Sequence, residues 1–161
     1  MADNTHSLSR VMTTFYSLVS TAKTTAPAPW ASNTDTPLRY PSTQPLDPGA
    51  AAQFIQVSVT HASSRRIQIN GAVEGAGRRH RFIGTVALFV RRQTGQQSLV
   101  AAADHFYAAV SERTLPVADA SAAPHQLVTL VPELTSPTDT SPDSAAWHFC
   151  AVHVEMYLDD L

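Results

Sequence analysis

The stretch RRHRFIGTVALFVRR, residues 78–92, is a mostly apolar run with arginines at both ends. Its apolar side chains fall into two alternating sets, which are Phe82, Val86, Leu88 and Val90, and Ile83, Ala87 and Phe89. Apolar residues in both sets predict a central β-strand that is covered on both faces. The arginines emerge at the two tips of this strand, where they can reach solvent, a nucleic acid, an anionic substrate or a neighbouring subunit.

Alternation predicts further strands on either side of this one. The segments are QFIQVSVTH (53–61), a shorter RRIQIN (65–70), HQLVTLVPELTS (125–136) and AWHFCAVHVEMYLDD (146–160). In the last segment one face carries His148, Cys150, Val152, Val154 and Met156, and the other carries Phe149, Ala151, His153, Glu155 and Tyr157.

Helical spacing of apolar residues predicts two amphipathic helices, over about residues 5–23 and within SLVAAADHFYAAVSERTL (98–115), where Ser98 is the expected cap. The element order is then helix, three strands, helix, two strands. This order predicts one α+β domain over residues 1–161, with a mainly antiparallel sheet of about five strands flanked by two helices.

Two segments are expected to be irregular. Six prolines within residues 24–52 exclude a helix or a central strand there, so an extended segment is expected. Trp30, Leu38 and Tyr40 are expected to anchor it, either to this subunit or to a neighbour. Residues 133–146, rich in Ser, Pro, Thr and Asp, are expected to form a long hairpin loop.

Composition limits the classes of function. The net charge is −2, but seven of the eleven Lys and Arg residues lie between Arg65 and Arg92, so any basic effect is local. A single cysteine, Cys150, excludes a disulfide framework within the chain. No apolar run approaches the roughly 20 residues that span a bilayer, so we expect a soluble protein that does not bind a membrane.

No set of residues resembles a catalytic or metal site. GAVEGAG, residues 71–77, lacks the Lys-Ser/Thr of a phosphate-binding loop. His153 and Glu155 lie on the opposite strand face from His148, so the three cannot bind one metal ion. Cys150 has apolar neighbours, where a thiol is inert. We therefore expect no enzymatic activity and no cofactor.

The arginines support two interpretations. Arg65, Arg66, Arg78, Arg79 and Arg81 could line a path for phosphates. Alternatively, arginines at the strand tips are solvated or pair with acids on the same or a neighbouring subunit. We favour this second interpretation, because the aromatic interleaving of single-strand binders is absent. The candidate interface comprises these five arginines with Arg91, Arg92, Trp30, Tyr40, Asp139, Asp143, Asp159 and Asp160.

The order of landmarks along the whole chain carries a resemblance. After an N-terminal helix come WASNTDTP (30–37), FIQVSV (54–59), SSRRIQI (63–69), RRHRFIGTVALFV (78–90), LVAAADHFYAAV (99–110), RTL (113–115) and AWHFCAVHVEMYLDDL (146–161). This order resembles the tail terminator proteins of long-tailed bacteriophages, also called tail completion or minor tail proteins. The basic residue, glycine and β-rich run of that family correspond to Arg81, Gly84 and residues 86–90.

The resemblance implies a structural virion protein. Such a protein forms a homo-oligomeric, hexameric ring on the tail tube, stops tube polymerisation and contacts head-completion or connector proteins, while double-stranded DNA passes through the lumen without sequence-specific binding. It would be assembled in the host cytoplasm and located at the head-proximal end of the tail. The arginines would then contact neighbouring subunits, the tube or the connector, with some facing the channel.

Alternative functions remain. They are another head–tail connector or neck ring protein, and a small nucleic-acid-binding module that uses the basic cluster from Arg65 to Arg92. The proline-rich segment and PELTSPTDTSPDSAA, residues 132–146, are larger than the family pattern. We expect both insertions to be contact arms.

Overall fold

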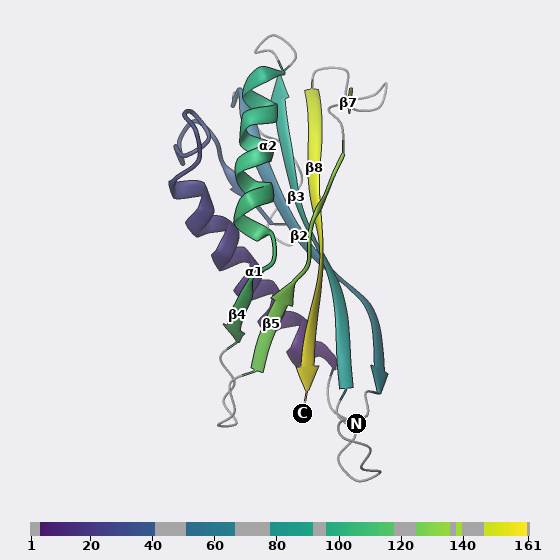
Figure 1. The fold of residues 1–161 in the computed structure, drawn as a ribbon. Helices are drawn as coiled ribbons and strands as arrows, with labels where there is room; N and C mark the ends of the chain where they lie inside the picture. Colours follow the sequence, from purple (N-terminus) through teal and green to yellow (C-terminus); the bar gives the residue numbers. More distant parts are fainter. Residues whose placement is uncertain are drawn as a thin grey trace.

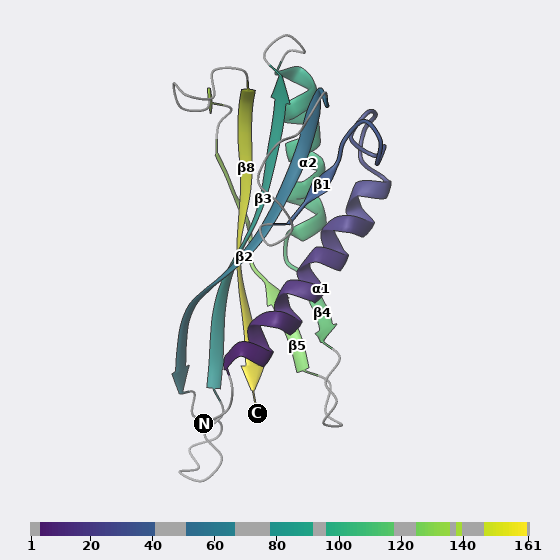
Figure 2. The same cartoon turned by 180° about the vertical axis from the view of Figure 1, so that it is seen from behind.

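Two helices pack on one side of a twisted β-sheet in the computed structural model, which describes residues 4–40, 51–66, 78–91, 96–117, 125–135, 138–139 and 147–160. Helices α1 (Asn4–Thr24) and α2 (Gln97–Val110) lie on the same face of the sheet in both views (Figures 1 and 2). The α+β class is therefore confirmed. Neither helix is long and apolar enough, within the described residues, to cross a membrane.

Three long strands form the centre of the sheet: β2 (Gln53–Arg66), β3 (Arg78–Arg91) and β8 (Trp147–Asp160). Shorter strands extend it at both sides, namely β1 (Leu38–Arg39), β4 (Thr114–Val117), β5 (His125–Thr129), β6 (Glu133–Leu134) and β7 (Thr138–Asp139). The order is β1-β2-β3-β8-β5-β4, with β6 and β7 also paired to β8. All described pairs are antiparallel except β1 with β2, so the sheet is mixed and has more strands than the five expected.

The differences from the expected strands have local causes. Arg65 and Arg66 end β2 rather than begin a separate strand, and residues 67–70 lie outside the described residues. The segment expected to continue α2 turns at Glu112, which has a φ of 51°, and then enters β4. Parts of the expected loop 133–146 pair with β8 as β6 and β7.

The core lies between the helices and the sheet. One alternating set of β3 and β8 side chains points toward the helices and is fully buried: Phe82, Val86, Leu88, Val90, Val152, Val154 and Met156. Phe15 of α1 packs directly over Gly84 of β3, where an added Cβ would lie 2.7 Å from the Phe15 Cζ atom. The missing side chain at Gly84 therefore lets α1 approach the sheet closely.

Among the described residues no helix packs on the other face of β3, so the expected coverage of both faces is not seen there. Ile83 on this face is 38% exposed, whereas Phe82 beside it is fully buried. Both helices occupy the opposite side because each has one apolar stripe to bury, and both stripes meet in one core.

The described first part of the proline-rich segment docks on its own subunit. The Trp30 Nε1–H group donates to Ser98 Oγ at 2.8 Å, and the Trp30 side chain is fully buried. The Ser98 hydroxyl therefore accepts a hydrogen bond from Trp30, and Ser98 is not the cap of α2 as expected. The N-cap of α2 is Gln96, which makes no side-chain cap hydrogen bond. Lys23 Nζ donates to three oxygens, those of Ala31, Ser32 and the Asn33 side chain. Burial lowers the pKa of Lys23.

Candidate functional site

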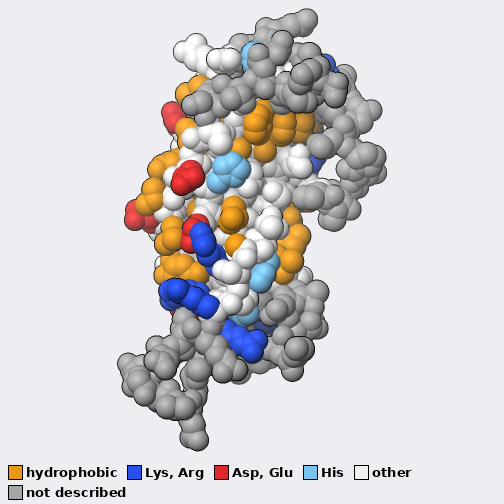
Figure 3. All heavy atoms as spheres, turned by 90° about the vertical axis from the view of Figure 1, so that its right-hand side faces the viewer, with side chains coloured by type: hydrophobic (Ala, Val, Ile, Leu, Met, Phe, Trp, Pro, Cys, Tyr) orange, Lys and Arg blue, Asp and Glu red, His pale blue; other side chains and the backbone are white. Residues whose placement is uncertain are grey.

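The sheet face opposite the helices is the candidate site, and we call it the open face because no described helix packs over it. The strand registers place these side chains of the three long strands on it: Phe54, Gln56, Ser58, Thr60, Ser63 and Arg65 of β2; Arg79, Arg81, Ile83, Thr85, Ala87, Phe89 and Arg91 of β3; and Trp147, Phe149, Ala151, His153, Glu155, Tyr157 and Asp159 of β8. Figure 3 views this side of the molecule, and most of its visible Lys and Arg side chains gather in the lower half.

Aromatic side chains fill one end of the open face. The Phe54 and Phe89 rings stack with centroids 4.4 Å apart, and the Phe149 ring lies 5.4 Å beyond Phe89. Trp147 meets Phe54 edge to face, and the Arg91 guanidinium lies 4.7 Å above the Trp147 ring. Arg91 therefore packs against its own subunit and lies at the opposite end of the face from the other arginines.

Ion pairs occupy the other end. Arg79 donates two hydrogen bonds to Asp159, both 2.6 Å long, and its guanidinium lies 4.2 Å above the Tyr157 ring. The hydrogen bonds with Asp159 raise the pKa of Arg79. Arg81 makes a similar two-point contact with Glu155, with Nε–Oε1 and Nη2–Oε2 distances of 2.6 Å. The expected pairing of an arginine with Asp159 thus occurs within one subunit.

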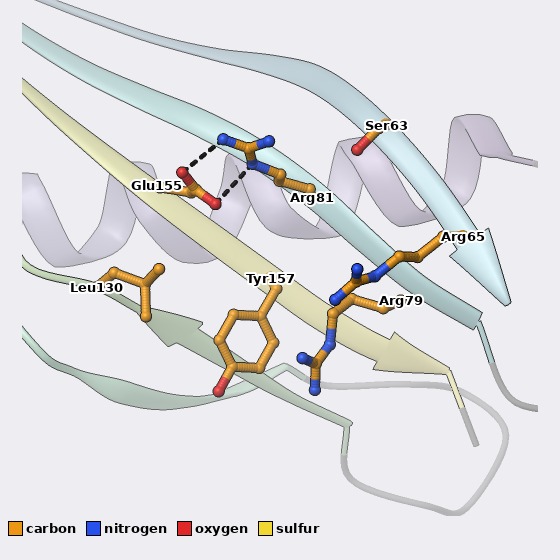
Figure 4. Close-up of a pocket in the computed structure, with 7 residues that line it drawn as sticks. All are labelled: Ser63, Arg65, Arg79, Arg81, Leu130, Glu155 and Tyr157. Atoms are coloured by element: carbon orange, nitrogen blue, oxygen red, sulfur yellow. Dashed lines mark hydrogen bonds and ion pairs between the residues drawn. The ribbon is translucent and has the colours of Figure 1, made fainter. Parts of the chain in front are cut away.

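A pocket of about 410 Å³ lies at this charged end (Figure 4). Its lining comprises Ser63, Arg65, Arg79, Arg81, Leu130, Glu155 and Tyr157. Arg65 lies directly across the strand pair from Arg79, and its side chain extends from the end of β2 toward Arg79. Within the described residues no carboxylate pairs with Arg65. Three arginine side chains thus face one pocket; Arg79 and Arg81 each have a carboxylate partner, and Arg65 has none among the described residues.

The remaining predicted interface residues are dispersed. Arg78 is exposed at the start of β3. Trp30 and Tyr40 pack within this subunit, Trp30 in the core and Tyr40 with its ring 4.3 Å from that of Tyr16, so Trp30 is not part of a candidate interface. The structure describes no side chain for Arg66, Asp139 or Asp160, and Arg92 and Asp143 lie outside the described residues.

At the centre of the open face, beside Ile83, the side chains are mostly small or polar. Thr85 Oγ1 and His153 Nδ1 share a hydrogen bond of 3.0 Å, while Glu155 is occupied by Arg81. Among the described residues no three His, Cys, Asp or Glu side chains are grouped so that they could hold a metal ion. Burial raises the pKa of the Cys150 thiol to about 11, on the helix side of the sheet.

Sequence reasoning identified the arginines but missed Glu155, Tyr157, Ser63 and Leu130. Glu155 and Tyr157 were placed together on one face of the last strand by alternation. Their position beside the arginines depends on the antiparallel register of β3 with β8, which faces Arg81 with Tyr157 and Ile83 with Glu155. The pairing of β3 with β8 would have been needed to place Glu155 and Tyr157 beside the arginines.

Comparison with known proteins shows a shared fold only. No family model matches the chain, and no curated protein matches it. One solved structure superimposes with a TM-score of 0.61 and covers 95% of this chain and 95% of its own, at 16% sequence identity. The name of that protein describes no activity.

Proposed function

We propose that this protein is a structural subunit that assembles into a ring and acts as the tail terminator of a long-tailed bacteriophage. The observation that carries the proposal is the open face, a side of three long strands that no described helix covers and that combines exposed Ile83 and Arg81 with half-buried aromatic side chains. A solvated sheet face is normally polar, whereas aromatic residues and arginine are enriched in protein interfaces.

A ring of identical subunits needs two different surfaces that complement each other. The open face supplies one such surface. The helices form the opposite side of the molecule (Figure 1), so a head-to-tail contact can join one subunit to the next without using the same surface twice.

The more specific role rests on the order of landmarks in the sequence. In this role the ring caps the tail tube, ends its polymerisation and meets the head connector, with DNA passing through its lumen. Another head–tail connector ring would use the open face in the same way, and only the partner distinguishes the two functions.

A nucleic-acid-binding module is the weaker alternative. Arg79 and Arg81 are each engaged by a carboxylate, so the arginine end carries less net positive charge than its number of arginines suggests. Binding of phosphates requires cations that can replace the counterions of the nucleic acid.

The mass of the purified protein in solution tests the proposal. Light scattering at two concentrations, followed by negative-stain imaging, should detect a closed ring such as a hexamer, either free or after addition of assembled tail tubes. In a polymerisation assay the protein should also limit tube growth. A protein that stays monomeric at both concentrations and neither binds tubes nor limits their growth would contradict the proposal.

A further inference from the structure

The charged end of the open face has an imbalance of charge. Arg65, Arg79 and Asp159 lie in one cross-strand row, in which the one carboxylate is bound by Arg79 and leaves Arg65 without a partner among the described residues. Like charges that face each other directly across two strands destabilise a sheet. Beside this row, Arg81 and Glu155 form an ion pair in which the two charges cancel. Among the described residues, the pocket is thus lined by three guanidinium groups and the carboxylate of Glu155, with Asp159 bound to Arg79, so the excess positive charge belongs to Arg65.

We propose that this pocket binds a carboxylate side chain in an acidic peptide segment of a partner protein, with Arg65 as its main ionic contact. The proposal deepens the assembly role above and rests on it only for the source of the peptide, which in a ring is a neighbouring protein. The pocket of about 410 Å³ has the size of a small ligand site and suits one or two peptide side chains.

The pocket is already organised for a planar anion. Arg79 is held by two hydrogen bonds to Asp159 and by the Tyr157 ring beneath it, so it loses little conformational freedom when a ligand binds. Arg65 adds a second guanidinium, whose parallel N–H groups match the two oxygens of a carboxylate. Ser63 lines the same pocket and adds a hydroxyl donor.

The surroundings favour a peptide over a nucleic acid. Leu130 in the pocket wall is 40% exposed, Val131 beside it is 58% exposed, and Ile83 on the adjoining part of the face is 38% exposed. These apolar side chains suit an acidic residue that has apolar neighbours. A nucleic acid would bring further phosphates toward Glu155 and Asp159, where each phosphate meets a negative charge.

A peptide titration of the full-length protein tests the proposal. The probe is the blocked peptide acetyl-Leu-Glu-Leu-amide, and its control is acetyl-Leu-Gln-Leu-amide, which has the same shape without the charge. Amide NMR signals of Ser63, Arg65 and Tyr157 should move with the Glu peptide, and the Gln peptide should bind at least about 10-fold more weakly.

Two variants identify the residue responsible. Arg65→Ala should weaken binding of the Glu peptide by about 10- to 100-fold, the range expected for a hydrogen bond to a charged group. Arg65 is exposed at a strand end, so the variant should fold, as its amide spectrum will show. Arg113→Ala is the matched control, because Arg113 is an exposed arginine that does not line the pocket, and this variant should bind as the wild type does.

Three results would overturn the proposal: equal binding of the two peptides, no binding at millimolar concentrations, or binding that Arg65→Ala leaves unchanged. A short DNA duplex that moves the same signals more tightly, and weakens steeply with salt, would assign the pocket to phosphates instead. The titration measures peptide binding to the pocket whether the protein is a monomer or a ring. A monomer that prefers the Glu peptide but neither binds tubes nor limits their growth would contradict the ring alone, and a ring that binds both peptides equally would contradict the pocket alone.

Discussion

The two faces of β3 are formed by alternating residues of one strand but have opposite environments. Toward the helices, Phe82, Val86 and Leu88 are completely buried. Toward the open side, Arg81 and Ile83 are exposed, although each is the direct neighbour of a buried residue. Because side chains alternate along a strand, one residue step separates the core from the surface.

This difference separates stability from binding. Side chains on the helix face remove apolar area from water, at roughly 25 cal/mol per Å². The two ion pairs on the open face are partly exposed, and pairs of this kind contribute at most about 1 kcal/mol each. We therefore expect substitutions on the helix face to change the free energy of unfolding, and substitutions on the open face to change association.

The largest effect is expected for Phe15→Ala. Phe15 is fully buried between α1 and the sheet, and truncation of a buried Phe costs about 3–5 kcal/mol. Urea unfolding followed by tryptophan fluorescence measures the loss. Phe89→Ala is the matched change on the open face, where the ring is half-buried, and it should cost less than half as much. Equal losses would show that both faces contribute equally to stability.

The thiol of Cys150 should make stability depend on pH. Burial raises its pKa from 9.0 to about 11, so the folded protein keeps a proton that the unfolded chain loses above pH 9. The free energy of unfolding should therefore fall between pH 9 and pH 11, by at most about 2.5 kcal/mol from this group. Cys150→Ala should lack this part of the decrease. Parallel pH curves for the two proteins would contradict the expected burial of the thiol.

Gly84→Ala should destabilise the protein by about 1–3 kcal/mol, as overpacking of a core does. The new Cβ would lie 2.7 Å from Phe15 Cζ and 2.9 Å from Met156 Cε. Phe15→Leu removes the closer atom, so Gly84→Ala should cost less in that background, and a double-mutant cycle of urea midpoints measures the difference. If Gly84→Ala stabilised the protein, the close approach of α1 would be wrong.

Much of the fold could be predicted from local patterns. Alternation in residues 146–160 separated Cys150 and Val152 from His153 and Glu155, and the structure buries the first pair and leaves the second pair half-buried. The apolar residues on the second face of β3 misled the prediction. Phe89 on that face is shielded by the neighbouring rings of Phe54 and Phe149 rather than by a helix.

The candidate site depended on contacts that no local pattern contains. Arg81 and its partner Glu155 are 74 residues apart in the chain. The 14-residue length of β3 also separates Arg91 from Arg79 by about 40 Å, at 3.3 Å per residue, so the basic cluster in the sequence divides into two ends of the open face. A net count of arginines could show neither the separation nor the pairing.

The smallest effect on stability, and a clear effect on association, is expected for Ile83→Thr. The change keeps a β-branched side chain at a site that is 38% exposed, so the free energy of unfolding should change by about 0.5 kcal/mol. Because Ile83 lies in the middle of the open face, removing its apolar surface should weaken subunit association by about 10-fold, measured by light scattering over a dilution series.

Val100→Thr provides the matched change on α2, where the side chain is 42% exposed on the other layer of the molecule. If this variant also associates more weakly while remaining folded, α2 belongs to the second surface that a head-to-tail ring requires. If it associates normally, that surface lies elsewhere.

An Ile83→Thr protein that assembles as tightly as the wild type would mean that the open face is not the subunit contact. Its exposed apolar and arginine side chains would then have to serve a partner other than a second copy of this chain.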